Sequence, residues 1–506
     1  MQGLLPERHT IPPVEVALTV KTERDTIPME AHLSYASATE VAEAIRSRTI
    51  SAVAVLETQL DRITHHNPQL NALVTVDVEG ARQRAIEADT ALARGEIWGP
   101  LHGVPITIKD FFEVAGMRST GSCPTFAKHI SQQDAISVAR LRSAGAVILG
   151  KTNLPEQAMD FQTNSPLFGR TNNPWDITHT PGGSTGGGAA AVAAGLSFLE
   201  LGSDLGGSIR IPAHFCGIYA LAPTYNLVPQ TGWIPEPPHT GTLANFIRVG
   251  PLTRSLADLR LGLEVLAGPD LHQPDVPPVT LKAPPSRPLQ TLRIAWTDDC
   301  GLPLCADTRA ALHTVVQQLI NQGCHVERAR PENFDFELVQ QLHKRFLFNA
   351  VGTHLPFIQR WLGRYLGKTA AFDLNMHKLL EAEAARMRLI VELEHFLAQW
   401  DAWLLPVAAR PAYPHLEPLR RRGAYAEYDP LSVDGHPVSY SLVNAGLTIP
   451  FNVTGQPVVV LPIGQSSEGL PIGAQLIGQR WHDMELLNVA EELDAVIGAW
   501  RSPPGY

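Results

Sequence analysis

The chain has 506 residues, of which 44% are hydrophobic and 18% are charged, so it can bury a large core and is neither disordered nor a coiled coil. Its 40 basic and 50 acidic residues give a net charge of −10, the wrong sign for a protein that binds nucleic acid. Five cysteines without zinc-type pairing, and the lack of a long apolar run, predict a cytoplasmic protein with no disulfide framework, no metal site and no membrane partner.

The N-terminal part of the chain predicts an arm followed by helices. Residues 1–30 lack clear periodicity and are expected to form a flexible arm ahead of one domain that spans residues 31–506. Ser37 with Glu40 three residues later is typical of a capping box, and Ser51 begins a second helical pattern. Both serines are therefore expected to cap helices.

Helices and strands then alternate along the chain. The pattern predicts a helix over 78–92, a strand over 103–110, a helix capped by Asp134 that ends at Gly145, and a short buried strand over 146–149. Such alternation is typical of a sheet with helices on both of its faces. We therefore expect an α/β fold with a mixed β-sheet core.

The second half of the chain is expected to return to the same sheet. A catalytic core is predicted over 70–265, and seven prolines make residues 268–288 an extended crossing between two halves. A helix-rich second half follows over 300–400. Residues 440–480 then return to the sheet, with a strand over 456–463, so we expect one large domain.

One motif resembles a nucleotide site. Residues 145–152 match GxxxxGK[ST], the pattern of a phosphate-binding loop. Such a loop must be a glycine-rich turn whose amides surround phosphate, whereas the four middle residues here are themselves predicted to be a strand. We therefore expect no nucleotide and no other cofactor.

Two glycine-rich serine motifs lie 24 residues apart. Ser184 stands within residues 182–186, which fit the GxSxG elbow of hydrolases, and Ser208 follows Gly206 and Gly207. Glycines before Ser208 let backbone amides converge beside it, as an oxyanion hole requires. Taken alone, the first motif also fits a tight turn that opens a helix of small residues.

Lys109 follows an apolar strand and is one of only eight lysines in the chain. Burial lowers the affinity of a lysine for its proton, which suits a general base near neutral pH. The alternative is a lysine that extends from the strand end into solvent.

Together these segments resemble the amidase signature family. The resemblance covers most of residues 35–490 and extends to further motifs at 99–105, 173–176, 250–255, 450–455 and 469–473. It implies one large α/β domain built on a mixed sheet. It also implies a hydrolase that cleaves linear C–N bonds other than peptide bonds in a small-molecule amide.

The resemblance further implies a Ser, cis-Ser, Lys triad. Ser208 matches the nucleophile and Lys109 matches the base. Ser184 matches the bridging serine, which is joined to Gly183 through a cis peptide bond. In such a triad the lysine draws a proton through the bridging serine while the nucleophile forms an acyl-enzyme.

The loop around the nucleophile is expected to stabilise the oxyanion. The groups that would do so are the backbone amides of Leu205, Gly206, Gly207 and Ser208. Asp204 and Arg210 match family positions that fix this loop and are not expected to react.

Four positions depart from the family pattern, and one of them, Ala222 in place of a common lysine, has no explanation in the sequence. Thr185 stands where a second serine is common, but it still offers a hydroxyl group. Gly188 also stands where serine is common. Asn226 stands where many members have glycine, and asparagine tolerates the positive φ of a turn. Catalysis is therefore expected to survive these changes.

Two other functions are compatible with the sequence. An α/β hydrolase with Ser184 as nucleophile needs one of the nineteen histidines within hydrogen-bond reach as its base. An amidotransferase subunit that supplies ammonia to a partner enzyme on aminoacylated tRNA needs a stable complex with a second protein. If the protein is an amidase, esters and carbamates are further candidate substrates.

The pocket and the quaternary structure are less specified. Three stretches are expected near the acyl and amine pockets, namely 123–129, 159–164 and 225–246. The last of them carries Trp233, Ile234, Leu243 and Phe246, which indicates either an apolar pocket for aryl or alkyl amides or ordinary core. Aromatic residues within 340–380 are expected to form a helical cover or an oligomer contact, for example of a homodimer.

Overall fold

A single mixed sheet of eleven strands organises the molecule. The computed structural model describes residues 33–234, 242–279, 281–282, 284–354, 376–422 and 425–506. In spatial order the strands are β1 (Leu73–Val76), β3 (Val147–Thr152), β2 (Pro105–Lys109), β6 (Leu199–Asp204), β8 (Arg248–Thr253), β7 (Tyr219–Ala222), β16 (Val458–Gln465), β17 (Pro471–Ile477), β11 (Ala402–Pro406), β9 (Arg293–Trp296) and β10 (His325–Arg328). Parallel and antiparallel pairs both occur, so the expected mixed sheet is confirmed.

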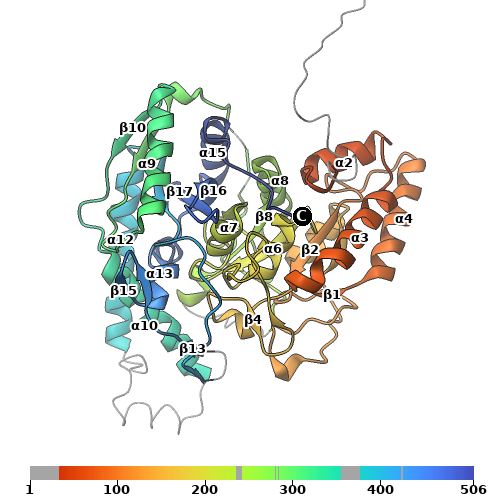
Figure 1. The fold of residues 1–506 in the computed structure, drawn as a ribbon, viewed down its shortest axis with the longest axis horizontal. Helices are drawn as coiled ribbons and strands as arrows, with labels where there is room; N and C mark the ends of the chain where they lie inside the picture. The colour runs from red at the N-terminus through yellow and green to blue at the C-terminus, as the bar shows by residue number, and fades with distance from the viewer. Residues whose placement is uncertain (1–32, 235–241, 280, 283, 355–375, 423–424) are drawn as a thin grey trace, which may run out of the picture.

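Helices surround this sheet (Figure 1). The main ones are α2 (Ala38–Arg46), α3 (Ala52–Leu70), α4 (Val78–Ala93), α5 (Ile136–Ser143), α6 (Gly186–Ala193), α7 (Arg210–Cys216), α8 (Leu256–Leu266), α9 (Ala306–Asn321), α10 (Phe336–His354), α12 (Met376–Leu397), α13 (Tyr440–Ala445), α14 (Ile449–Thr454) and α15 (Asp483–Ile497). Figure 1 shows α2, α3 and α4 gathered at one end of the molecule and α9, α10 and α12 at the other.

Alternate residues of one strand show that both faces of the sheet are covered. In β16, Val459 and Leu461 belong to the main core, which also contains residues of α8, α9 and α15. Val460 points to the other face, where it packs in a smaller apolar cluster with residues of α6 and α7. Successive side chains of a strand point to opposite faces, so the two clusters lie on the two sides of the sheet.

The predicted helix starts are mostly confirmed. Ser37 and Glu40 form the expected capping box of α2, and the Ser51 side chain caps α3. The prediction that Asp134 caps the next helix is wrong, because α5 begins after Ala135 without a side-chain cap. The Asp134 carboxylate instead accepts a hydrogen bond from the Ala115 amide and pairs with Arg142.

The second half returns to the sheet, as predicted. β16 overlaps the strand expected over 456–463, shifted by two residues at each end, and pairs with β7, with Val458 opposite Ala222. Residues 1–30, and 355–375 within the aromatic stretch, lie outside the described residues. The division into an arm and a domain, and the oligomeric state, stay predictions.

Two local predictions are also confirmed. The middle of the phosphate-loop string lies in β3, where Lys151 is buried and its Nζ bonds the Phe112 carbonyl and the Ser119 hydroxyl. The string is therefore strand and not a phosphate-binding turn. Asn226 has φ of 57°, in the left-handed region that the turn requires.

Candidate active site

Lys109 is enclosed at the end of β2. None of its surface is exposed, and its Nζ lies 2.8 Å from Ser184 Oγ and 3.0 Å from the hydroxyls of both Thr185 and Ser203. Burial lowers the pKa of Lys109 to about 7, although nearby carboxylates act in the opposite direction. A large fraction of this amine is therefore neutral near neutral pH, and its neighbours are hydroxyl groups.

Ser184 lies in the tight segment before α6, on a cis peptide bond from Gly183. A Cβ atom at position 183 would lie 2.6 Å from the Asp160 carbonyl oxygen, so the close approach of the two backbones requires glycine there. Thr163 donates a hydrogen bond of 2.8 Å to the Gly182 carbonyl from the same neighbouring segment. The backbone thus holds the Ser184 side chain against Lys109.

Ser208 stands just before α7, and 7% of its surface is exposed. Its carbonyl accepts a hydrogen bond of 3.1 Å from the Thr185 amide, which ties the two serine motifs together. No hydrogen bond joins the hydroxyls of Ser184 and Ser208, both of which belong to the described part of the chain. The structure therefore brings Lys109 and Ser184 into contact and holds Ser208 beside them through the backbone.

The loop over 205–208 is held by contacts from the second half of the chain. The Thr448 hydroxyl donates to the Gly206 carbonyl at 2.7 Å, and His343 Nε2 lies 3.1 Å from the Leu205 carbonyl. Burial lowers the pKa of His343 to about 4, so the ring is neutral and donates through Nε2. Both carbonyls are thereby held by side chains of the second half of the chain.

One of the four expected oxyanion amides is already engaged. The Gly207 amide donates to the Asp204 carboxylate at 2.7 Å. Within the described residues, the amides of Leu205, Gly206 and Ser208 donate to no acceptor. Three of the four groups thus have a free hydrogen.

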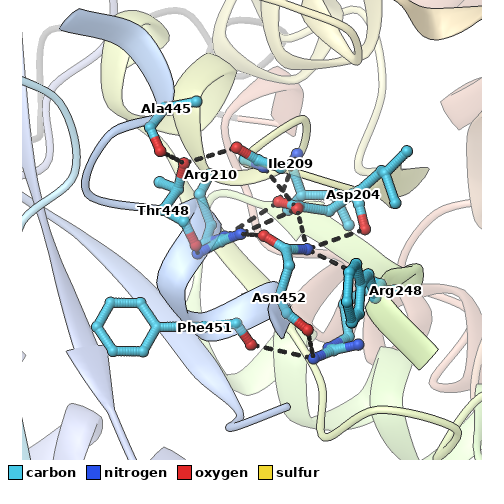
Figure 2. Close-up of polar contacts among 12 residues, drawn as sticks. Asp204, Ile209, Arg210, Arg248, Ala445, Thr448, Phe451 and Asn452 are labelled. Carbon is cyan, nitrogen blue, oxygen red and sulfur yellow. Dashed lines mark hydrogen bonds and ion pairs between the residues drawn. The ribbon is translucent and has the colours of Figure 1, made fainter. Parts of the chain in front are cut away.

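Asp204 and Arg210 form the buried ion pair that fixes this loop (Figure 2). Asp204 also accepts hydrogen bonds from the Ile209 amide at 3.0 Å and from Asn452 Nδ2 at 2.9 Å. Burial raises the pKa of the Asp204 carboxyl, but the Arg210 guanidinium and these hydrogen bonds outweigh it, so the pKa lies well below its usual range. Arg210 also donates to the Thr448 carbonyl at 2.8 Å, which joins the loop to α14.

Several of these residues were not predicted from the sequence. Thr185 and Ser203 lie inside the glycine-serine segments, and Asn452 lies inside the 450–455 motif, so proximity to the motifs was a usable signal. His343 and Thr448 are more than 130 residues away from the loop in the chain. No local pattern marks them, because their role depends on tertiary packing.

The histidine alternative finds no support in the geometry. Lys109 is the hydrogen-bond partner of the Ser184 hydroxyl, and none of the described histidines bonds to it. The described part of the chain also holds no group of three or more His, Cys, Asp or Glu side chains that could bind a metal. No helix in that part is long and apolar enough to cross a membrane.

Aromatic rings lie beside the lysine. The Phe111 ring centroid is 5.8 Å from Lys109 Nζ and 4.9 Å from the centroid of Trp233. Trp233 also packs edge-on against Phe112. Lys109 Nζ therefore has hydroxyl groups as its hydrogen-bond partners and one aromatic ring within 6 Å, while the carboxyls that act on it are those of Glu200 and Asp204.

Comparison with known proteins places this arrangement in a family. The amidase family model matches residues 54–487. An acylamidase of Rhodococcus erythropolis is 31% identical over 92% of this chain and 96% of its own length, and a glutamyl-tRNA(Gln) amidotransferase subunit from a Synechococcus strain is also 31% identical, over 91% and 96%. The solved structure of a 6-aminohexanoate cyclic dimer hydrolase with substrate is similar at a TM-score of 0.79, with 28% identity over 93% of this chain and 99% of that one. The chain therefore belongs to the amidase signature family of C–N hydrolases.

Proposed function

We propose that the protein is a serine amidohydrolase that cleaves carboxylic amides to an acid and an amine or ammonia. Ser208 is the nucleophile, and Ser184 and neutral Lys109 relay its proton. One observation carries the proposal: a lysine with no exposed surface lies 2.8 Å from the Ser184 hydroxyl. A buried amine with a pKa near 7 can act as a base at neutral pH.

The relay proceeds in balanced steps. Neutral Lys109 takes the proton of the Ser184 hydroxyl, Ser184 takes that of Ser208, and Ser208 Oγ attacks the amide carbonyl. When the tetrahedral intermediate collapses, the same path returns the proton to the leaving nitrogen and leaves an acyl-enzyme. Water then attacks the ester and gives its proton to the relay, which returns a proton to Ser208 Oγ as the acid departs. The hydrogen bond between the two serines forms as substrate enters, as active-site contacts often do.

The oxyanion is stabilised by loop amides. The Gly207 amide is bound to Asp204, so we assign the role to the amides of Leu205, Gly206 and Ser208. Asp204, Arg210 and Gly183 act as supports, since they hold the loop and the close approach beside Ser184. Removing one hydrogen-bond donor of an oxyanion hole typically lowers turnover a hundredfold to a thousandfold.

The aromatic residues near the lysine support a proposal for the substrate class. Phe111 lies beside Lys109 and Trp233 packs on Phe111, which favours apolar or aryl amides and is compatible with small esters and carbamates. The acylamidase relative supports an amide substrate. All five cysteines are free, which is consistent with the reducing cytoplasm as the location we propose.

Two serine variants and a lysine variant test the mechanism. In Ser208→Ala we expect hydrolysis of a chromogenic anilide to fall by at least about a thousandfold, and Lys109→Ala should lose a similar factor. Ser137→Ala is the matched control, because this buried hydroxyl on α5 has no hydrogen-bond partner among the residues that the structure describes. Ser208→Ala with wild-type turnover would overturn the proposal.

The amidotransferase subunits among the relatives support a second candidate function. In that case the protein would act inside a complex with a second protein. Turnover of simple amides by the purified chain, without ATP, supports the free amidase. Co-purification of a stable partner together with no activity on a panel of amide, ester and carbamate chromogens would favour the amidotransferase role.

A further inference from the structure

Glu200 is an enclosed carboxyl group that the proposed reaction does not use. It lies on β6 and has no exposed surface. The Thr152 hydroxyl donates a hydrogen bond of 2.6 Å to its Oε1, and hydrogen bonding by the Thr107 side chain also favours its charged form. Burying a carboxyl group with so few donors around it is costly, so such a group calls for an explanation.

Glu200 and Lys109 point to the same face of the sheet. β2 pairs Thr107 with Glu200, and paired residues of neighbouring strands share a face, so Lys109 two residues further along points to that face too. Ile108 and Leu201 point to the opposite face and belong to the main core. The two ionisable side chains thus occupy the same layer, between the sheet and α6.

Gly188 gives the carboxyl its space. A Cβ atom at position 188 would lie 2.3 Å from Cγ and Cδ of Glu200, a distance that real Cβ atoms do not reach. The glycine that stands where serine is common in the family is therefore explained, because the Glu200 side chain fills the volume that a larger residue would take.

Few charged groups surround Glu200. Helix α6, which covers it, carries no titratable side chain. Lys109 comes from β2, and Asp204 lies further along β6 itself. Lys151 of β3 pairs with Ile108 and therefore points to the opposite face, although its charge also lowers the pKa of Glu200. Of these two lysines, Lys109 is the one that lies on the same face of the sheet as the carboxyl.

We propose that Glu200 is a positioning residue that acts through Lys109 and sets how readily Lys109 gives up its proton. The inference rests on the proposed role of Lys109 as the base. Burial raises the pKa of Glu200 to about 7 and lowers that of Lys109 to about 7, so the two groups titrate as a coupled pair. When the two groups share one titratable proton, it can sit on Glu200, which leaves both groups neutral, or on Lys109, which leaves both charged. The neutral state avoids the cost of two buried charges. Ionised Glu200 has the opposite effect, because it favours protonated Lys109.

The pH profile of Glu200→Gln tests this. Glutamine keeps the Oε1 acceptor for Thr152 but cannot become negative, so Lys109 loses the charge that favours its protonated form. We expect the acidic limb of kcat/KM to move to lower pH by at least about half a unit. A purely structural role would lower activity without moving this limb, and an unmoved or upward-shifted limb would overturn the proposal.

A matched control uses another buried carboxyl. Burial raises the pKa of Asp483 to about 6, and its carboxylate bonds the amide and hydroxyl of Thr224. Asp483→Asn should leave the acidic limb where it is. A shift equal to that of Glu200→Gln would mean that any buried carboxyl affects the limb, which contradicts a specific pairing with Lys109.

A double-mutant cycle keeps the test independent of how well the glutamine variant folds. Gly188→Ala should displace the Glu200 carboxyl and move the limb in wild type, but not in a Glu200→Ala background. Equal shifts in both backgrounds, or none in wild type, would contradict the proposal. Lys109→Ala separates the proposed role of the base from that of Glu200. If Lys109→Ala stays active, the assignment of Lys109 as the base fails. If Lys109→Ala is inactive but the acidic limb of Glu200→Gln is unmoved, only the role of Glu200 fails.

Discussion

The proton affinity of a single enclosed amine governs the predicted pH dependence. Lys109 must be neutral to accept a proton, and its pKa is about 7 because burial disfavours its charged form. For a neutral amide substrate we therefore expect kcat/KM to rise with pH and to reach half its plateau near pH 7. The measurement is a pH series of initial rates, and a flat profile between pH 6 and 8 would contradict the assignment.

The same amine affects stability with a sign that can be worked out. Its pKa of about 7 in the folded protein lies below the ordinary 10.5, so the unfolded chain binds more protons between these values. The free energy of unfolding should therefore gain a contribution that increases with pH across this range. Lys109→Met should reduce that dependence, while buried Lys151, whose pKa is also lowered by burial, retains a part of it, as urea titrations at pH 7 and pH 9 would reveal. An unchanged slope would indicate that the folded amine keeps an ordinary proton affinity.

The buried ion pair below the nucleophile loop should be sensitive to loss of one partner. Arg210→Met leaves the Asp204 carboxylate enclosed without its cation, which typically costs about 3 to 5 kcal/mol. We expect a marked fall in the urea midpoint and loss of activity. Arg210→Met combined with Asp204→Leu should recover part of the stability but not the activity. Recovery of neither would contradict the charge argument.

At the scale of elements, α10 and α14 of the second half hold a loop of the first half. Thr448→Val removes the hydrogen bond to the Gly206 carbonyl, which allows the loop amides to turn. We expect kcat to fall about tenfold to a hundredfold while KM changes little, because the loss concerns transition-state contacts. Thr448→Ser retains the hydroxyl and should keep most of the activity. A fall confined to KM would contradict this role.

Elements with local signals were the predictable part of the fold. Ser37 and Ser51 could be recognised as caps because an N-cap side chain accepts a hydrogen bond from the backbone amide only three residues later, so the signal lies within one helical turn. Asp134 failed as a cap because Ala115 and Arg142, both brought close by the tertiary fold, offer its carboxylate other partners. The candidate triad could be predicted from motifs, whereas the contacts of His343 and Glu200 could not, since each depends on which strands and helices become neighbours.

At the scale of the whole molecule, the shared sheet couples the two halves. β7 of the first half pairs with β16 of the second, and Arg210 donates to the Thr448 carbonyl across the same boundary. We therefore expect both halves to unfold in one transition. The tryptophans that report through fluorescence include Trp175 in the first half and Trp403 in the second. The urea unfolding transition followed by this fluorescence should coincide with the transition followed by far-UV circular dichroism. Two separated transitions would contradict the coupling.

The order of the strands also has a consequence for biosynthesis. Among the described strands, β9, β10 and β11 reach the rest of the sheet only through β17 and β16, which follow all three in the chain. A nascent chain that ends before residue 458 therefore carries two unjoined sheet fragments with exposed edges, at a synthesis rate of roughly 5 to 20 residues per second. Chaperone demand should accordingly be high until β16 and β17 have been synthesised, and a chain truncated before residue 458 should yield aggregates and not a partly active enzyme.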